Sequence, residues 1–578
     1  MAAQQPAAQG SIPTSEARSW LASYPAGVDW SASFTARTVP ALLDDAISRF
    51  GDRTATNFLG RTMTYRELGG RVEQAAAALQ RHGVKDGTRV GLFLPNSPTY
   101  IVYYYAALKL GAVIVNYNPL YTHDEVVHQV RDSGTELMVT LDLKLLFDKV
   151  ERLVAEGVLP RALVASFTAL LPATKSVLFK LFRGRELAHP GRSAVRDRLL
   201  IEGDVLGGEQ TPYVPAAVKP GDLAVIQYTG GTTGTPKGAM LTHANLTINV
   251  AQSGAWSSQL LKAGEERVLA VLPFFHVFAM TGIMNFGLSE GAEIIVVPRF
   301  ALDDTINLIA KSRPTVMPGV PTLFAAIMGH PDASKLDLHS LKLCLSGGAP
   351  LPLEVKKGFE ALTGAKLVEA YGLSETSPGA TCNPLDGRAK SGSIGQPLPQ
   401  TMISIREIGE PEKEVAPGQT GEICIAGPQV MKGYWNKPAE TAEAFVGPYF
   451  RTGDVGYMDA EGFVFIVDRI KDMIICSGFK VFPRHVEEKI YEHPAVEEVT
   501  VIGIKDAYRG EAPKAYIKLK AGATVTVEDM RNHLATRLSK IEMPSEIEFR
   551  DILPKTVIGK LSKKELKAEA ASDARAGQ

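Results

Sequence analysis

The stretch YTGGTTGTPKGAMLTH at residues 228–243 combines glycines, threonines and one lysine, a composition suited to binding a phosphate. Backbone N–H groups of a glycine-rich turn can converge on an anion, and the ammonium of Lys237 adds a point charge. The common phosphate loop reads G-x-x-x-x-G-K-[ST] and leads directly into a helix. Here Pro236 precedes the lysine and Gly238 follows it, so the Ser or Thr that would bind magnesium is missing. The sequence therefore predicts a phosphate-binding loop of another kind.

Four further stretches carry residue types that nucleotide and metal chemistry needs. YGLSETSP at 371–378 supplies an aromatic ring, a turn glycine, one carboxylate and flanking hydroxyls. YFRTGDVG at 449–456 has an aspartate at a glycine turn. DRIKDMIICSGFKVFPRHVEE at 468–488 supplies an arginine, a charged pivot and a glycine loop. PKTVIGKLSKKEL at 554–566 carries a lysine behind a glycine.

In this order and at these separations, the stretches resemble the adenylate-forming superfamily of acyl-CoA synthetases, luciferases and peptide-synthetase adenylation domains. The resemblance covers about residues 40–570. The segments VNYNPLYTHDE, SGSIGQPLPQ and GPQVMKGYW are most like those of bacterial long-chain fatty-acid–CoA ligases. The resemblance implies an AMP-forming acid–thiol ligase that uses a fatty acid, ATP, Mg²⁺ and CoA. Acyl-AMP and pyrophosphate would form first, then acyl-CoA and AMP.

Nucleotide-binding roles follow from the resemblance, because the protein must screen the triphosphate, hold magnesium and stabilise charge at phosphorus. Glu375 would bind the metal, although a lone loop glutamate is usually a solvated residue. Asp454 would accept the two ribose hydroxyls, to which Arg469 also donates. The glycines of the loop could instead form a mere tight turn. The implied ATP- and AMP-binding set is Thr229, Gly230, Gly231, Thr232, Thr233, Gly234, Thr235, Lys237, Gly348, Ala349, Tyr371, Gly372, Thr376, Asp454, Arg469 and Lys560.

Lys560 is implied to be the adenylation lysine, whose ammonium bridges the acid's carboxylate and the α-phosphate. A lysine in a cluster near a chain end is otherwise most often solvated. The resemblance implies a catalytic set of Lys560, Thr233, Glu375 and His276. A histidine among phenylalanines is most often a packed core residue. By resemblance His276 borders an acyl pocket that consists of His276, Val277, Met280, Gly319 and Gly347.

A mobile C-terminal domain is also implied by the resemblance. The family's small domain rotates between an adenylating and a thiolating pose, and the hinge position corresponds to Lys471. In the thiolating pose the glycine loop would meet CoA. The implied CoA contacts are Ser477, Gly478, Gly510 and Glu511.

The elements that must position these residues are those of an α/β protein. Strand-like runs alternate with amphipathic segments from about residue 40 to 340, which indicates parallel sheets covered by helices. Short strands with glycine punctuation after residue 395 predict a small β-barrel-like subdomain, and a mobile α+β domain follows. The predicted division is a flexible tail at 1–30, an ATP- and acyl-binding domain at 31–468, a hinge at 469–471, a mobile domain at 472–570 and a tail at 571–578.

Composition excludes several classes of protein. With 45% hydrophobic and 22% charged residues among 578, the chain is globular and long enough for two or more domains. A net charge of −1 gives no reason to expect a nucleic-acid partner. The four cysteines have no C-x-x-C spacing, which argues against a zinc site and favours a reducing compartment. No secretory signal is visible, so we expect a cytoplasmic protein.

Residues 160–200 contain eight Arg or Lys and two acidic residues, with apolar and aromatic residues interleaved. A basic amphipathic stretch of this kind can lie on an anionic membrane, here at its inner face, or can be an ordinary surface insertion. The sequence is also compatible with a medium-chain or aromatic acid–CoA ligase, with a fatty acyl-AMP ligase that serves a carrier protein, and with an inactive lipid- or nucleotide-binding scaffold. It is equally compatible with a homodimer.

Overall fold

Two sheets form the large N-terminal part of the protein, which has one large hydrophobic core and smaller hydrophobic clusters beside it. The computed structural model describes residues 18–207, 212–229, 236–506, 508–555 and 561–576. The first sheet has seven strands, all parallel to their neighbours except the last. Their order is β7 (Leu199–Ile201), β6 (Arg161–Ala165), β5 (Leu137–Leu141), β3 (Arg89–Leu92), β4 (Val113–Asn116), β8 (Leu223–Thr229) and β9 (Lys237–Thr242).

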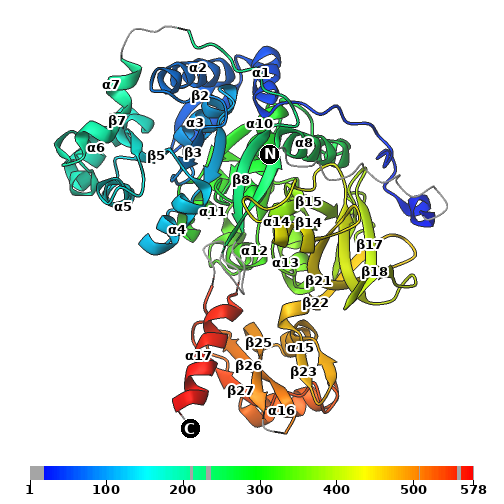
Figure 1. Cartoon of the computed structure of the whole chain (residues 1–578). Coiled ribbons are helices and arrows are strands. Elements are labelled where there is room, and N and C mark those ends of the chain that lie inside the picture. Colours follow the sequence, from blue (N-terminus) through cyan, green and yellow to red (C-terminus); the bar gives the residue numbers. More distant parts are fainter. Residues whose placement is uncertain (1–17, 208–211, 230–235, 507, 556–560, 577–578) are drawn as a thin grey trace.

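The second sheet joins a parallel half to an antiparallel half (Figure 1). Its parallel half consists of β14 (Lys366–Gly372), β13 (Leu343–Ser346), β12 (Val316–Gly319), β10 (Arg267–Ala270), β11 (Glu293–Val296) and β1 (Thr54–Phe58), with β2 (Arg61–Thr64) antiparallel at the edge. The antiparallel half consists of β15 (Gly379–Cys382), β16 (Ser393–Pro397), β22 (Val464–Arg469), β21 (Tyr449–Met458), β19 (Gly421–Ala426), β17 (Met402–Glu407) and β18 (Glu410–Glu414), with β20 (Phe445–Val446) beside β21. The predicted barrel-like subdomain is therefore an extension of the second sheet.

Helices pack against both sheets, as the alternating pattern predicts. The apolar run at 101–118 is accounted for by a buried helix and β4, and Ser97 caps this helix by accepting the Tyr100 N–H. No helix in the described ranges is long and apolar enough to cross a membrane. Besides α6 and α9, which are described below, the described helices of this part are α1 (Val39–Phe50), α2 (Tyr65–Arg81), α3 (Pro98–Lys109), α4 (His123–Ser133), α5 (Lys144–Ala155), α7 (Glu202–Leu206), α8 (His243–Ser257), α10 (Phe286–Ser289), α11 (Leu302–Ser312), α12 (Pro321–Met328), α13 (Leu353–Thr363) and α14 (Pro438–Glu443).

The C-terminal part has a core of its own and lies below the large part in Figure 1. Its sheet has the order β24 (Phe479–Val481), β23 (Ile474–Cys476), β26 (Gly510–Leu519) and β25 (Val496–Asp506), and β27 (Glu546–Phe549) pairs with β26. The helices are α15 (Pro483–Tyr491), α16 (Val527–Ala535) and α17 (Lys563–Ala576). The prediction of a tail from residue 571 is wrong as far as Ala576, because α17 continues to that residue.

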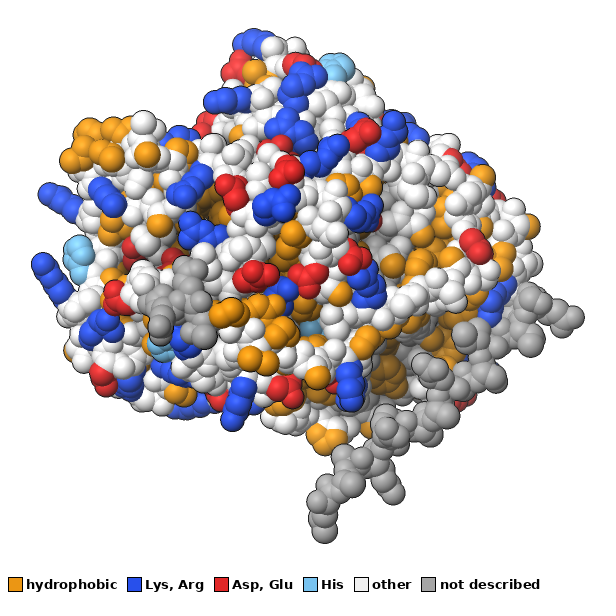
Figure 2. Space-filling model, turned by 90° about the horizontal axis from the view of Figure 1, so that it is seen from above, with side chains coloured by type: hydrophobic (Ala, Val, Ile, Leu, Met, Phe, Trp, Pro, Cys, Tyr) orange, Lys and Arg blue, Asp and Glu red, His pale blue; other side chains and the backbone are white. Residues whose placement is uncertain are grey.

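Helix α6 (Ala173–Arg183) lies in the basic segment 160–200, and none of its residues is buried. It lies at the outer end of the first sheet, near α5 and β7, at the left in Figure 1. Val177, Leu178, Leu181 and Phe182 are 52–81% exposed. Figure 2 shows a hydrophobic patch with basic side chains around it at the same end of the molecule. The helix is held to the body by Phe179, whose ring centroid lies 5.1 Å from that of Phe167.

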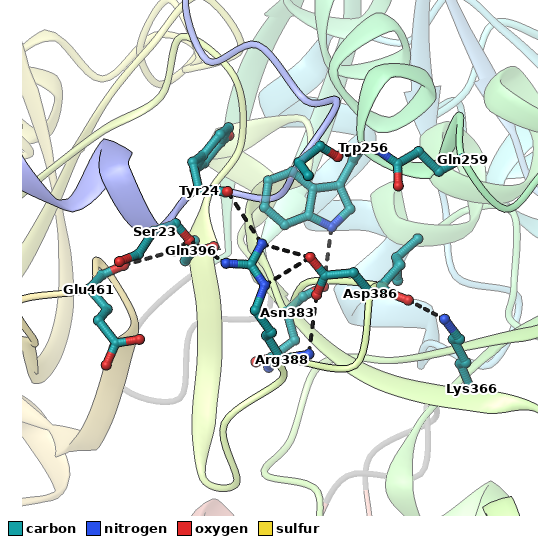
Figure 3. Close-up of polar contacts among 12 residues, drawn as sticks. Ser23, Tyr24, Trp256, Gln259, Lys366, Asn383, Asp386, Arg388, Gln396 and Glu461 are labelled. Carbon is teal, nitrogen blue, oxygen red and sulfur yellow. Dashed lines mark hydrogen bonds and ion pairs between the residues drawn. The ribbon is translucent and has the colours of Figure 1, made fainter.

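Residues 18–30 form an N-terminal strap that packs on the antiparallel half of the second sheet, so the prediction of a flexible tail as far as residue 30 is wrong in this part. Trp20 and Trp30 are buried, and their rings are perpendicular to each other. Two buried tryptophans supply enough apolar surface to anchor a short segment. Figure 3 shows the polar anchors: Arg388 donates to the carbonyls of Ser23 and Tyr24 at 3.1 and 3.3 Å.

Candidate nucleotide and acyl site

The predicted phosphate loop connects two antiparallel strands. Thr229 ends β8 and faces Lys237, which begins β9. A side chain at Gly238 would approach Ile226 to 2.5 Å, so glycine permits the close pairing of these strands. The structure thus brings Thr229 and Lys237 to one end of the first sheet. Predicted loop residues outside the described ranges are Gly230, Gly231, Thr232, Thr233, Gly234 and Thr235.

Glu375 is buried in a short 3-10 turn, Ser374–Thr376, directly after β14. Its Oε1 accepts a hydrogen bond from the Tyr434 hydroxyl at 2.9 Å. Burial raises the pKa of Glu375, and the Tyr434 hydroxyl and the nearby Lys237 only partly offset this effect. A cation would stabilise this buried carboxylate. Thr376 is also buried, and its hydroxyl accepts the Leu373 N–H at 2.9 Å within the turn.

The donor set at Glu375 fits magnesium rather than a metal held by protein ligands alone. The described residues contain no group of three or more His, Cys, Asp or Glu that could hold a metal ion. Mg²⁺ is usually bound through one or two carboxylates together with substrate phosphates. One buried carboxylate close to Lys237 is consistent with that mode, since the lysine contributes to the electrostatic environment of Glu375.

A second cluster joins the two halves of the second sheet. Asp454 in β21 is opposite Arg469 in β22, and Tyr371 lies near the end of β14. The Tyr371 hydroxyl donates to Asp454 Oδ2 at 2.6 Å, and Arg469 Nε lies 3.0 Å from Oδ1. Burial and the Asp454 charge raise the pKa of Tyr371, so it remains a hydrogen-bond donor. Three residues of the predicted ATP- and AMP-binding set therefore meet at the Asp454 carboxylate, and the predicted Gly372 follows Tyr371 directly.

The glycine turn after β13 lies against the segment that carries His276. Gly347 N–H donates to the Gly319 carbonyl at 3.1 Å, so two predicted acyl-pocket residues are neighbours. A Cβ at Gly347 would lie 2.9 Å from Phe278 Cε1. Gly348 is exposed and has φ +82°, a left-handed conformation that favours glycine, and the half-buried Ala349 follows it. The ring of Phe278 thus occupies the space that a side chain at Gly347 would need.

His276 caps a short helix, α9 (Val277–Ala279), by accepting the Phe278 N–H at Nδ1. A π-helical turn, Met280–Asn285, follows directly. Such turns occur frequently at functional sites. The Met280 N–H donates to the His276 carbonyl at 2.9 Å, so Met280 lies one turn beyond the histidine. Met280 Sδ accepts a hydrogen bond from Asn116 at 3.3 Å, which fixes this buried side chain.

The four predicted CoA contacts lie together at the same end of adjacent strands in the C-terminal sheet. Ser477 and Gly478 form the turn between β23 and β24, and Gly510 and Glu511 begin β26. The Ser477 N–H donates to the Arg509 carbonyl at 2.8 Å, and Glu511 accepts the Ile475 N–H at 2.8 Å. Ser477, Gly478 and Gly510 all have φ between +51° and +81°. Ser477, Gly478 and Gly510 are exposed, and Glu511 is half-buried.

The hinge position Lys471 is in a 3-10 turn, Ile470–Asp472, between the two parts of the protein. Partial burial of its ammonium and the adjacent Arg469 charge lower the pKa of Lys471. One ion pair ties the C-terminal helix α17 to the hinge turn, Lys567 to Asp472 at 2.7 Å, and a second ties it to α15, Lys563 to Glu487 at 2.9 Å. The predicted catalytic Lys560 lies outside the described residues.

Sequence reasoning missed Tyr434, which contacts Glu375. The segment GPQVMKGYW resembles the ligase family but has no spacing that assigns a role to its tyrosine. Nothing in the sequence indicates that this tyrosine reaches a residue 59 positions earlier.

Comparison with known proteins identifies the family. The model of the AMP-binding enzyme family matches residues 43–435, and that of the AMP-binding enzyme C-terminal domain matches residues 485–560. The chain belongs to the AMP-binding enzyme family. This confirms the resemblance to adenylate-forming enzymes that the motifs indicated.

Curated relatives of this AMP-binding enzyme match it over nearly its whole length. A long-chain-fatty-acid–CoA ligase of Bacillus subtilis is 42% identical over 554 residues, which are 95% of this chain and 98% of the relative. The Escherichia coli O157:H7 protein of the same name is 36% identical with the same coverage. A feruloyl-CoA synthase of Amycolatopsis is 33% identical over 515 residues, 89% of this chain and 95% of the relative.

Solved structures share the fold. ATP-bound MatB from Rhodopseudomonas palustris has a TM-score of 0.80 and 29% identity, covering 92% of this chain and 99% of that one. The anthranilate CoA ligase AuaEII in complex with anthranoyl-AMP has a TM-score of 0.81 and 25% identity, covering 94% and 100%. The predicted α/β class, with a large parallel-sheet domain and a small C-terminal domain, is confirmed.

Proposed function

We propose that the protein is an ATP-dependent long-chain fatty acid–CoA ligase of the AMP-forming class. The observation that carries the proposal is the full-length similarity, at up to 42% identity, to proteins named as such ligases. The grouping of Lys237, Glu375 and Asp454 supports it, because adenylation needs a phosphate ligand, a metal ligand and a ribose ligand. The co-substrates are a fatty acid, ATP and CoA, with Mg²⁺ as the metal.

In the first step the fatty acid carboxylate attacks the α-phosphorus of ATP, and pyrophosphate leaves. Lys237 and the loop from Thr229 to Thr235 bind the β- and γ-phosphates, and Thr376 contacts the α-phosphate. Mg²⁺, held by Glu375 and phosphate oxygens, would neutralise the charge of the leaving pyrophosphate. Lys560 bridges the carboxylate and the α-phosphate. Asp454 and Arg469 fix the ribose, and Tyr371 packs on the adenine.

In the second step the CoA thiol attacks the acyl carbonyl, and AMP leaves. The domain at 472–570 rotates about the hinge at 469–471, against the domain at 31–468, and brings Ser477 and Gly478 to the site. The acyl chain runs past His276 and Met280 and alongside the neighbouring glycines Gly319 and Gly347. An apolar path suits long chains, since each buried methylene contributes roughly 0.8 kcal/mol.

The test is AMP release from ATP and Mg²⁺, with and without CoA, across a series of acids from butyrate to oleate that includes ferulate. We expect CoA-dependent turnover with the highest kcat/KM for long chains. A maximum at ferulate or at butyrate would contradict the long-chain substrate. Acyl-AMP that accumulates at the same rate with and without CoA would contradict the second step.

We further propose that α6 docks this enzyme on an anionic lipid surface, where long-chain acids partition. Its apolar side chains Leu181 and Phe182 are 71% and 81% exposed. Lys180 in the helix and Arg185 just after it are also exposed, as is Arg192 in the same basic segment, and their charge complements anionic headgroups. A basic amphipathic helix of this kind lies in the membrane interface with its apolar face inserted.

Co-sedimentation with vesicles that contain phosphatidylglycerol tests this docking. We expect binding at low salt that weakens at high salt, because exposed charges are screened. The double variant Leu181→Ser, Phe182→Ser should lose binding. The control Ile552→Ser removes an apolar side chain that is 80% exposed in the C-terminal part, and should bind as the parent does. Absence of binding by the parent at low salt would contradict the proposal.

A further inference from the structure

Residues 431–435 form a short link between β9 and the turn that carries Glu375. Along one side the link pairs with β9: Met240 donates to the Gly433 carbonyl at 2.9 Å, and Trp435 donates to the Gly238 carbonyl at 2.7 Å. At its start, the Met431 N–H donates to the Glu375 carbonyl at 2.7 Å. The link therefore joins the strand that carries Lys237 to the turn that carries Glu375.

Tyr434, near the end of this link, contacts both charged side chains. Its hydroxyl donates to Glu375 Oε1 at 2.9 Å. The Lys237 ammonium lies 4.5 Å from the centroid of its ring, within the range of a cation–π interaction. Tyr434 is only 7% exposed, so both interactions take place away from bulk water. One side chain thus reaches the proposed metal ligand and the proposed phosphate ligand.

We infer that Tyr434 is a positioning residue that sets Glu375 for the metal and Lys237 for the phosphates. A hydrogen bond to one carboxylate oxygen fixes the orientation of Glu375 and leaves Oε2 for the cation. The ring holds the ammonium through a cation–π contact, which leaves its hydrogen-bond donors for the phosphates. A direct Lys237–Glu375 ion pair would instead occupy the carboxylate that the cation needs. The inference rests on the proposed function, because it takes Mg²⁺–ATP as the ligand.

The two contacts can be separated by substitution. Tyr434→Phe keeps the ring beside Lys237 and removes the hydroxyl that Glu375 accepts. Tyr434→Leu removes both. Mn²⁺ replaces Mg²⁺ as the probe, and its binding is followed by electron paramagnetic resonance with ATP present and no fatty acid, so that no turnover occurs. ATP binding without metal is measured by calorimetry in EDTA.

We expect Tyr434→Phe to weaken Mn²⁺ binding about ten-fold, the effect of losing one hydrogen bond to a charged group. Its affinity for ATP in EDTA should stay that of the parent. Tyr434→Leu should also weaken ATP binding in EDTA, because the ring no longer positions Lys237. In a Glu375→Gln background, Tyr434→Phe should have no further effect on Mn²⁺ binding.

Trp435→Phe is the matched control, since it removes a hydrogen bond from the same link, from Nε1 to the Asp132 carbonyl at 3.1 Å, without touching Glu375 or Lys237. Equal losses of Mn²⁺ affinity in Trp435→Phe and Tyr434→Phe would show a merely structural role and overturn the inference. Unchanged Mn²⁺ affinity in Tyr434→Phe would also overturn it. A parent protein that binds no Mn²⁺–ATP would instead overturn the proposed function.

Discussion

Asp454→Asn should weaken ATP binding through the loss of one ionic acceptor. The Asp454 side chain is almost fully buried, with a Tyr371 hydroxyl at 2.6 Å and Arg469 Nε at 3.0 Å. The amide keeps one acceptor oxygen and turns an NH₂ group toward the other donor. One hydrogen bond to a charged group contributes about 1.5–3 kcal/mol, so we expect ATP affinity to fall roughly 10- to 150-fold.

The assay is calorimetric ATP binding together with the KM for ATP at saturating fatty acid and CoA. The control is Asp459→Asn, which removes an ion pair to Lys390 at 2.6 Å in the turn after the same strand. We expect the control to bind ATP as the parent does. If Asp454→Asn binds ATP within about two-fold of the parent while its melting temperature is unchanged, the assignment of Asp454 to the ribose is refuted.

Three further predictions concern the reaction and stability. Lys560→Ala should abolish acyl-AMP formation but still form the thioester from synthetic acyl-AMP and CoA; equal losses in the two half-reactions would contradict its role. Burial raises the pKa of Glu369 to about 7 from 4.5, so the stability that its neutral form provides is present below about pH 4.5 and lost as pH rises through about 7. Glu369→Gln should therefore gain stability over the parent from about pH 5 to about pH 8, by at most about 3 kcal/mol. The same difference in melting temperature between variant and parent at both pH values would contradict this. Trp30→Ala should lower stability by about 3–5 kcal/mol in denaturant unfolding without changing the KM for ATP, and a loss below about 1 kcal/mol would show that the strap is not anchored there.

Much of the fold could be predicted from the sequence because its patterns are local. The apolar run before Lys109 and Gly111 is typical of a buried helix that leads into a strand, and the structure has both. The strap at 18–30 could not be predicted in this way. Its composition resembles a flexible tail, whereas its anchors, such as the Trp30 hydrogen bond to the Thr401 carbonyl, depend on residues about 370 positions away.

The candidate site, like the fold, could be predicted from the sequence only in part. Asp454 and Arg469 could be proposed from their motifs, and strand pairing explains why they meet. Tyr434 could not be proposed, because its role depends on a link that pairs with β9 on one side and with the Glu375 turn on the other. Such a contact follows from tertiary packing and leaves no periodic pattern in the sequence.

The measurement that tests the proposed function most directly is a product balance with oleate, ATP, Mg²⁺ and CoA. Oleoyl-CoA, AMP and pyrophosphate are quantified together by mass spectrometry as the reaction proceeds. We expect the three products in equal amounts. Without ATP none of them should form, and without CoA product formation should stop after the first turnover. Formation of ADP and phosphate, or AMP without oleoyl-CoA, would contradict an AMP-forming fatty acid–CoA ligase.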